Sequence, residues 1–290
     1  MPTANHRPDA IQATFALADI PAAQRLVIEA GWNQSGADWE TFVTLGQVFT
    51  VREGGGIDAT AATLPYAGGF GWISMVLVTK ARQRQGLATA LLARCIADLR
   101  SRGLVSVLDA TPAGREVYRR LGFVVGWAIS RWHRAASTTL APTPASSRIR
   151  PILPHDLPAI IALDADAFGC ARPQLLDRLH ARSIGFACMA TDASGRPSAF
   201  LLGRDGRNAT QLGPLVAQDE ETAIALIDHA LPRNPGPLMI DALDRHSLVA
   251  RALETRGFAI QRPFTRMTLD RATPFGDDRL MMAIAGPELG

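Results

Sequence analysis

The stretch from Met75 to Gly103 constrains the fold of this chain more than any other part of the sequence. It begins with a short apolar run, Met75 to Val78, which is typical of a buried strand. A polar turn follows, and Gly103 is a residue that commonly ends a helix. Between them, apolar residues recur at the spacing of one helical face, at Ala88, Leu91, Leu92, Cys95, Ile96 and Leu99. The sequence therefore predicts a strand, a tight turn and a helix in direct succession.

The turn between this strand and this helix is a candidate anion site. The first N–H groups of a helix have no intrahelical partners, and they point along the positive end of the helix dipole. Gly86 and Ala88 leave space for a phosphate group to approach the backbone. The turn lacks the Gly-Lys-Ser/Thr ending of a P-loop and the three glycines of a dinucleotide-binding fold. We therefore expect a phosphorylated cofactor of another class.

The spacing Gln83-x-x-Gly86-x-Ala88 resembles the Gln/Arg-x-x-Gly-x-Gly/Ala signature of the GNAT N-acetyltransferase superfamily. In that family the loop amides bind the pyrophosphate of acetyl-coenzyme A (acetyl-CoA), and the preceding strand pairs its backbone with the pantetheine arm. The resemblance implies that acetyl-CoA is the co-substrate. It also implies the residues that contact acetyl-CoA, which are Val76, Val78, Gln83, Arg84, Gln85, Gly86, Leu87, Ala88 and Thr89.

A second motif lies downstream of the first. Leu104 to Leu108 is predicted to be a strand, and Pro112 is well placed at the start of the next helix. Tyr118, followed by Gly122-Phe123, resembles the Tyr-x-x-x-Gly-Phe pattern of many GNAT enzymes. In those enzymes the tyrosine acts as general acid on the departing thiolate, which implies a catalytic role for Tyr118. The alternative is that Tyr118 is a packed aromatic residue whose hydroxyl reaches solvent.

A general base is harder to identify. An alkylamine with a pKa of about 10.4 is mostly protonated at neutral pH, so its attack on a thioester requires a base. Related enzymes often supply a glutamate on the strands that flank the cofactor, but Phe70 to Val78 contains no acidic residue. Asp109 is the remaining candidate, unless it hydrogen-bonds the backbone of the turn that follows it. A water relay, a base from elsewhere in the chain, or a substrate that needs no strong base are the other possibilities.

The composition excludes some classes of partner and favours a cytoplasmic protein. The chain has 30 basic and 27 acidic residues among 290, so its charge does not indicate a nucleic-acid partner. The N-terminus is polar, and no stretch approaches the roughly 20 apolar residues of a membrane helix. Three widely separated cysteines show neither metal-ligand nor disulfide spacing. We therefore expect no membrane partner, no metal ion and a reducing compartment.

The sequence contains an internal repeat. Asp19-Ile20-Pro21-Ala22 recurs as Asp156-Leu157-Pro158-Ala159, and Gly122-Phe123 recurs as Gly257-Phe258 at nearly the same offset. Repeated signals in the same order predict two copies of one fold. The stretch between them is rich in Ser, Thr, Pro and Ala, which is typical of a linker. The predicted organisation is a cofactor-binding domain at 1–136, a linker at 137–147 and a second domain at 148–290.

The second copy differs where the cofactor loop should be. After Leu215-Val216 the chain carries Asp219, Glu220 and Glu221, which suit a helix N-terminus but repel a pyrophosphate. We therefore expect the second domain to have lost cofactor binding and to shape the substrate cleft. A working first copy followed by a degenerate second copy resembles a group of two-domain GNAT proteins, as does the segment Arg262 to Met267.

These patterns predict an α+β fold with a mixed sheet, in which each domain is a twisted, mostly antiparallel sheet with helices on both faces. In the first half we expect helices at 20–30 and 38–45 and strands at 48–51, 59–64 and 70–78. In the second half we expect helices at 156–167, 173–182, 221–231 and 245–256, and strands near 185–191, 197–204, 209–216 and 237–242.

The acceptor is the least constrained part of the prediction. Trp32 and Asn33 follow the first helix, where this fold usually gates the acceptor, and Trp72 and Ser74 share one face of the cofactor strand. The expected function is acetyl-CoA-dependent transfer of an acetyl group to a primary amine of a small molecule, amino acid or peptide. The alternative is a non-catalytic acyl-CoA-binding sensor or scaffold. In either case we expect a monomer or a weak dimer.

Overall fold

The computed structural model describes residues 11–53, 56–137, 148–183 and 185–290. The chain forms two compact units, residues 1–108 and residues 109–290. Apart from Ser137, the predicted linker lies outside the described residues. None of the described helices is long and apolar enough to cross a membrane.

The first unit is built on a sheet in which neighbouring strands run antiparallel until the last pair. The strands follow one another in the order of the chain: β1 (Ile11–Gln12), β2 (Gln47–Glu53), β3 (Gly56–Tyr66), β4 (Phe70–Val78) and β5 (Val105–Ala110). The pair β4–β5 is parallel, because helix α3 (Leu87–Ser101) carries the chain back across the sheet between them. The predicted succession of strand, turn and helix is thereby confirmed.

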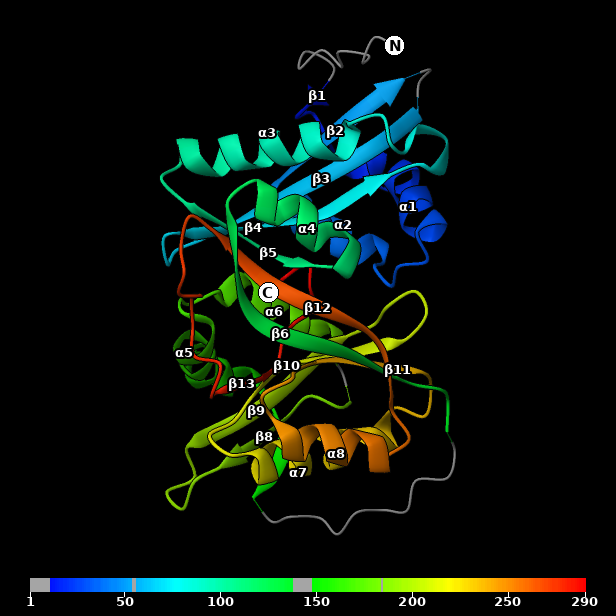
Figure 1. Ribbon diagram of the computed structural model, residues 1–290. Coiled ribbons are helices and arrows are strands. Elements are labelled where there is room, and N and C mark those ends of the chain that lie inside the picture. The colour runs from blue at the N-terminus through cyan, green and yellow to red at the C-terminus, as the bar shows by residue number, and fades with distance from the viewer. Residues whose placement is uncertain (1–10, 54–55, 138–147, 184) are drawn as a thin grey trace. The chain divides into compact units, whose positions relative to one another are not determined.

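Helices cover both faces of this sheet. Helix α3 lies on one face, and α1 (Ile20–Glu29) and α2 (Gly36–Leu45) lie on the other (Figure 1). Of the predicted apolar face of α3, four residues are fully buried, whereas Ala88 is exposed. The buried residues are Leu91, Leu92, Cys95 and Leu99. Helix α2 begins with a capping box, because the Ser35 backbone N–H donates to the Asp38 carboxylate at 2.8 Å.

The second unit contains a larger sheet with the strand order β12-β6-β11-β13-β10-β9-β8-β7. Its strands are β6 (Phe123–Arg134), β7 (Ile149–Pro151), β8 (Cys188–Thr191), β9 (Pro197–Arg204), β10 (Thr210–Val216), β11 (Leu238–Leu243), β12 (Ala259–Leu269) and β13 (Met281–Ala283). Its helices are α4 (Pro112–Arg120), α5 (Leu157–Phe168), α6 (Pro173–Arg182), α7 (Glu220–Ala230) and α8 (Ser247–Thr255).

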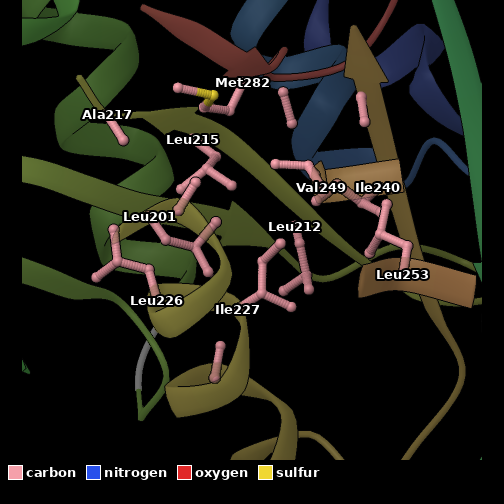
Figure 2. Close-up of a cluster of buried hydrophobic side chains, with 14 of the residues drawn as sticks. Leu201, Leu212, Leu215, Ala217, Leu226, Ile227, Ile240, Val249, Leu253 and Met282 are labelled. Atoms are coloured by element: carbon pink, nitrogen blue, oxygen red, sulfur yellow. The ribbon is translucent and has the colours of Figure 1, made fainter. Parts of the chain in front are cut away.

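The core of the second unit lies between the sheet and helices α7 and α8. Leu201, Leu212 and Leu215 project from the strands and pack with Leu226 of α7 and Leu253 of α8 (Figure 2). These side chains are fully excluded from solvent. The mixed, mostly antiparallel sheets with helices packed on them confirm the predicted α+β class.

Strand β6 shows why the compact units do not follow the sequence repeats. It belongs to the first repeat, yet it pairs antiparallel with two strands of the second, so that Ile129 faces Leu243 of β11 on one side and Phe264 of β12 on the other. The division of contacts therefore falls between Leu108 and Asp109. The predicted domain limits at 1–136 and 148–290 follow the sequence repeat and remain a prediction.

Candidate cofactor site

Strand β4 has an edge that is only partly paired. It pairs with β5 at Phe70, Gly71 and Trp72, and among the described residues of the first unit no strand continues this side of β4 beyond Trp72. Val76 and Val78 are half-buried along this stretch, whereas the alternating residues are buried. An unpaired strand edge presents N–H and C=O groups to any extended chain that lies beside it. This edge therefore suits an extended, amide-containing ligand.

A β-bulge bends β4 at the start of the free edge. The register with β3 shifts between the pairs Ala62–Ser74 and Thr60–Leu77, and Met75 has a positive φ of 52°. The Thr60 hydroxyl donates a 2.8 Å hydrogen bond to the carbonyl oxygen of Met75, which fixes this uncommon conformation. Bulges of this kind bend a strand away from its neighbour and recur beside active sites. The bulge thus opens the sheet where the free edge begins.

The free edge leads into an exposed helix N-terminus. After the short 3-10 turn Lys80–Arg82, Gly86 adopts φ +83° and α3 starts at Leu87. Gly86 has no side chain to cap the first turn, and the space around its Cα is open. Ala88 and Thr89 are exposed in that turn. Because the first N–H groups of a helix lack intrahelical acceptors and lie at the positive end of the dipole, this terminus can bind a phosphate group.

Side chains around the loop hold its shape. The Glu29 carboxylate accepts hydrogen bonds from the Thr79 hydroxyl at 3.0 Å and from the Lys80 backbone N–H at 2.7 Å. Arg82 pairs with Glu53 and donates a 2.8 Å hydrogen bond to the Gln85 side chain. The side chain of Gln85, a predicted contact residue, therefore stabilises the loop itself.

Gln83 donates a hydrogen bond of 3.4 Å to the carbonyl oxygen of Val78, which ties the loop to the end of β4. Lys80 and Arg84 are exposed on either side of this tie. Their positive charges add to the field of the helix N-terminus. The structure thus brings together the strand and loop residues predicted to contact the cofactor.

The four predicted substrate residues all belong to the first unit but differ in exposure. Trp32 is half-buried and Asn33 is buried in the loop between α1 and α2. Trp72 is only 1% exposed, which gives its indole a packing role in the interior. Ser74 is buried as well, and within the described part of the chain its hydroxyl is an orphaned polar group. Because buried hydroxyls are normally hydrogen-bonded, Ser74 marks a place where a ligand or a water molecule is expected.

Asp109 lies near the end of β5, where the second unit begins, and its carboxylate forms an ion pair. Both oxygens accept hydrogen bonds from Arg266, at 2.9 Å and 3.0 Å, and Arg266 also stacks 4.7 Å from the Trp127 ring. Burial raises the pKa of Asp109, while the guanidinium of Arg266 opposes that rise. Neither predicted role, the general base or the bond to the following turn, includes this ion pair, and the catalytic role of Asp109 stays a prediction. The partner lies 157 residues away in the sequence, so no local pattern could reveal it.

Tyr118 is half-buried on α4, also in the second unit. Its ring lies against Gly114 and packs 5.9 Å from the ring of Phe123. The Thr111 hydroxyl accepts a 3.3 Å hydrogen bond from the Gly114 N–H and so caps the helix that carries Tyr118. The contact of Tyr118 with a thiolate remains a prediction.

In the described part of the second repeat, the helix that follows β10 has a capped N-terminus, unlike α3. The Asp219 carboxylate caps α7 by accepting a 2.7 Å hydrogen bond from the Thr222 N–H. Glu220 accepts from the Leu248 and Val249 N–H groups at 2.7 and 2.9 Å, which caps α8. These acids are part of the fold of the second unit and cap the N-termini of α7 and α8.

A free strand edge that runs into an uncapped helix N-terminus is an arrangement that an extended phosphorylated ligand would fit. Two family models, each described as an acetyltransferase (GNAT) domain, match residues 44–125 and residues 160–281. The chain therefore carries two GNAT acetyltransferase domains in tandem, as the repeat predicted. Membership of this family implies acyl transfer from an acyl-CoA.

Comparison with individual proteins agrees with this assignment. The chain is 26% identical over 237 residues to an uncharacterized N-acetyltransferase, YitH, of Bacillus subtilis, which covers 81% of this chain and 82% of the relative. The fold is similar to a putative acetyltransferase from Pyrococcus horikoshii, with a TM-score of 0.79, 18% identity, and coverage of 100% of this chain and 99% of the other. It is also similar to a tandem GNAT protein from the clavulanic acid biosynthesis pathway, with a TM-score of 0.65, 14% identity, and coverage of 89% and 97%.

Proposed function

We propose that this protein is an acetyl-CoA-dependent N-acetyltransferase that acts on a primary amine of a small molecule, amino acid or peptide. The observation that supports it best is the free edge of β4 continuing into the uncapped N-terminus of α3. Acetyl-CoA carries two amides in its pantetheine arm, and a pyrophosphate follows that arm. The free edge of β4 is complementary to the amides, and the N-terminus of α3 is complementary to the pyrophosphate.

In this proposal the backbone N–H groups from Gly86 to Thr89 hold the pyrophosphate, and the backbone of Val76 and Val78 pairs with the pantetheine amides. Arg84 adds positive charge at the loop. The bound co-substrate supplies an activated acyl group as its thioester. The protein residues then orient that thioester at the bulge of β4.

The chemistry requires one proton to leave the amine and one to reach the sulfur. The amine nitrogen forms the new bond to the acyl carbon as the carbon–sulfur bond breaks. We propose that the Tyr118 hydroxyl donates its proton to the leaving sulfur. We propose no carboxylate as the base, since Asp109 is occupied by Arg266. The orphaned hydroxyl of Ser74 is instead a candidate to hold the amine or a water that relays its proton.

The first experiment is thiol release from acetyl-CoA across a panel of amines, amino acids and peptides, with calorimetric cofactor binding measured in parallel. Turnover with one class of acceptor supports the enzyme and identifies its substrate class. Binding without turnover on any acceptor favours the second candidate, a non-catalytic acyl-CoA sensor. The one observation that favours a sensor is the engagement of Asp109 in a buried ion pair. A cytoplasmic location and a monomer or weak dimer remain parts of the proposal.

A further inference from the structure

The second repeat contains a counterpart of the partly paired edge of β4. Strand β10 runs parallel to β11 over three residue pairs, Thr210–Leu238, Gln211–Met239 and Leu212–Ile240. This matches the three pairs by which β4 meets β5. The register of β10 with β9 then shifts between Leu212 and Leu215, as the register of β4 with β3 shifts at its bulge. The two strands therefore diverge at the corresponding place in both repeats.

In the second repeat the gap between the diverging strands is filled by β13. Ala283 pairs with Leu215 of β10 on one side and with Ala242 of β11 on the other. The Ile284 N–H donates a 3.0 Å hydrogen bond to the Asp241 carbonyl oxygen of β11. Met282 and Ala283 belong to the same buried cluster as Leu215. Figure 2 shows Met282 and Leu215 in this cluster. The chain thus supplies its own extended segment where the first repeat has a free edge.

The strand β10 is shaped to accept this segment. Gly213 has φ +135°, a conformation that favours glycine, and a Cβ at this position would collide with the carbonyl oxygen of Ile284. Close approach of the inserted backbone therefore depends on Gly213. Ala217, just past the end of β10, donates a further backbone hydrogen bond of 3.1 Å to Leu280.

The residues after β13 are anchored by buried arginines. Arg204 pairs with Glu288, and both side chains are 3% exposed. Arg204 also donates to the carbonyl oxygen of Ala285, and Arg172 donates to that of Leu289 at 3.1 Å. Buried charges of this kind are costly unless they are paired, so the anchors hold the segment in one register.

We propose that Met281–Leu289 acts as a ligand of the second domain that is part of the same chain. This segment fills the gap between β10 and β11, which corresponds to the slot beside β4 that holds the co-substrate in the first domain. The second domain is then folded with its slot filled, and each chain binds one coenzyme. The proposal rests on the proposed function only for the identity of the ligand in the first slot. The insertion of β13 itself is independent of any coenzyme.

Hydrogen–deuterium exchange on the full chain tests this inference directly. Without ligand, we expect the Ile284 amide to exchange as slowly as amides in β10 and β11. Saturating acetyl-CoA should slow exchange between Val76 and Thr89 at least tenfold and leave Leu215–Thr222 unchanged. Fast exchange at Ile284, or protection of Leu215–Thr222 by acetyl-CoA, would overturn the inference. If acetyl-CoA protects no segment, the proposed function fails, while the behaviour of Ile284 still decides the insertion of β13.

A matched pair of glycine variants adds a second test. Gly213→Ala should speed exchange at Ile284 at least tenfold, because the new methyl group displaces the inserted backbone. Gly236→Ala is the control, since a Cβ at Gly236 meets open space in the same unit. Unchanged exchange at Ile284 in a folded Gly213→Ala variant contradicts the inference. If that variant does not fold, the exchange pattern of the unmodified chain decides.

Discussion

Replacing Asp109 by Asn distinguishes a structural carboxylate from a catalytic base. Asn preserves the size of the side chain but removes the charge that faces Arg266, which is 2% exposed. One of two charge-assisted hydrogen bonds can survive through the amide oxygen, while the guanidinium loses its counter-charge. Breaking a buried ion pair on one side typically costs about 3–5 kcal/mol.

We therefore expect Asp109→Asn to lower the free energy of unfolding by about 3 kcal/mol, near the lower end of that range. For a unit of this size, that corresponds to a fall in Tm of about 10 °C. Urea unfolding followed by circular dichroism measures the loss. Turnover per folded molecule, and its dependence on pH, should stay within about threefold of the unmodified protein.

The double variant Asp109→Leu with Arg266→Met is the control. Replacing both charges by apolar groups of similar size removes the uncompensated ion, so the pair should recover most of the lost stability. Unfolding that is unchanged within about 0.5 kcal/mol, combined with a 100-fold fall in turnover, would refute the structural role. That outcome would return Asp109 to the position of general base.

Three further predictions concern Tyr118, Asp156 and Ser74. Tyr118→Phe should lower kcat by about 100-fold or more, while the calorimetric affinity for acetyl-CoA stays the same. Tyr66→Phe is the control, and an unchanged kcat in Tyr118→Phe removes Tyr118 from the mechanism. Hydrogen bonds from Arg150 lower the pKa of Asp156 to about 2 from 3.8. The ionised carboxylate therefore stabilises the fold above pH 3.8, and this stabilisation is lost as the pH falls toward 2. Because Arg150 is 40% exposed, we expect this pair to contribute about 1 kcal/mol to the free energy of unfolding. Arg150→Met should therefore unfold at a higher pH than the unmodified protein during acid titration. Identical acid-unfolding curves for the two proteins contradict this prediction. Ser74→Ala should raise KM for the amine without changing stability by more than about 0.5 kcal/mol, whereas Ser198→Ala should leave KM unchanged; equal KM values for both variants argue against a ligand contact.

Elements with a strong local pattern could be predicted from the sequence. Apolar spacing placed α3, and the Gly86 turn placed the helix N-terminus, because both depend on residues a few positions apart. The repeat signals predicted the tandem arrangement that the two family models confirm. Pro112 similarly predicted the start of α4, where the structure adds the Thr111 side chain as the cap.

Features that depend on distant parts of the chain could not be predicted in this way. The sequence gives no local sign that β6 lies between β11 and β12, or that Asp109 meets Arg266. The apolar run Leu280 to Ala285 was a usable signal for β13, but its insertion between β10 and β11 depends on space made by Gly213. Burial of Trp72 likewise follows from packing that periodicity alone does not specify.

The most direct test of the central claim is calorimetric titration of acetyl-CoA into the unmodified chain and into Ala88→Glu. A carboxylate in the first turn of α3 neutralises part of the positive potential of the helix N-terminus and repels the pyrophosphate, so Kd should rise at least tenfold, about 1.4 kcal/mol. Ala97→Glu places the same charge on an exposed position of α3 about 13 Å farther along, beyond one Debye length, and should leave Kd unchanged. We predict one site per chain that Ala88→Glu weakens and Ala97→Glu preserves. Absence of binding, or equal affinity in all three proteins, would contradict the account.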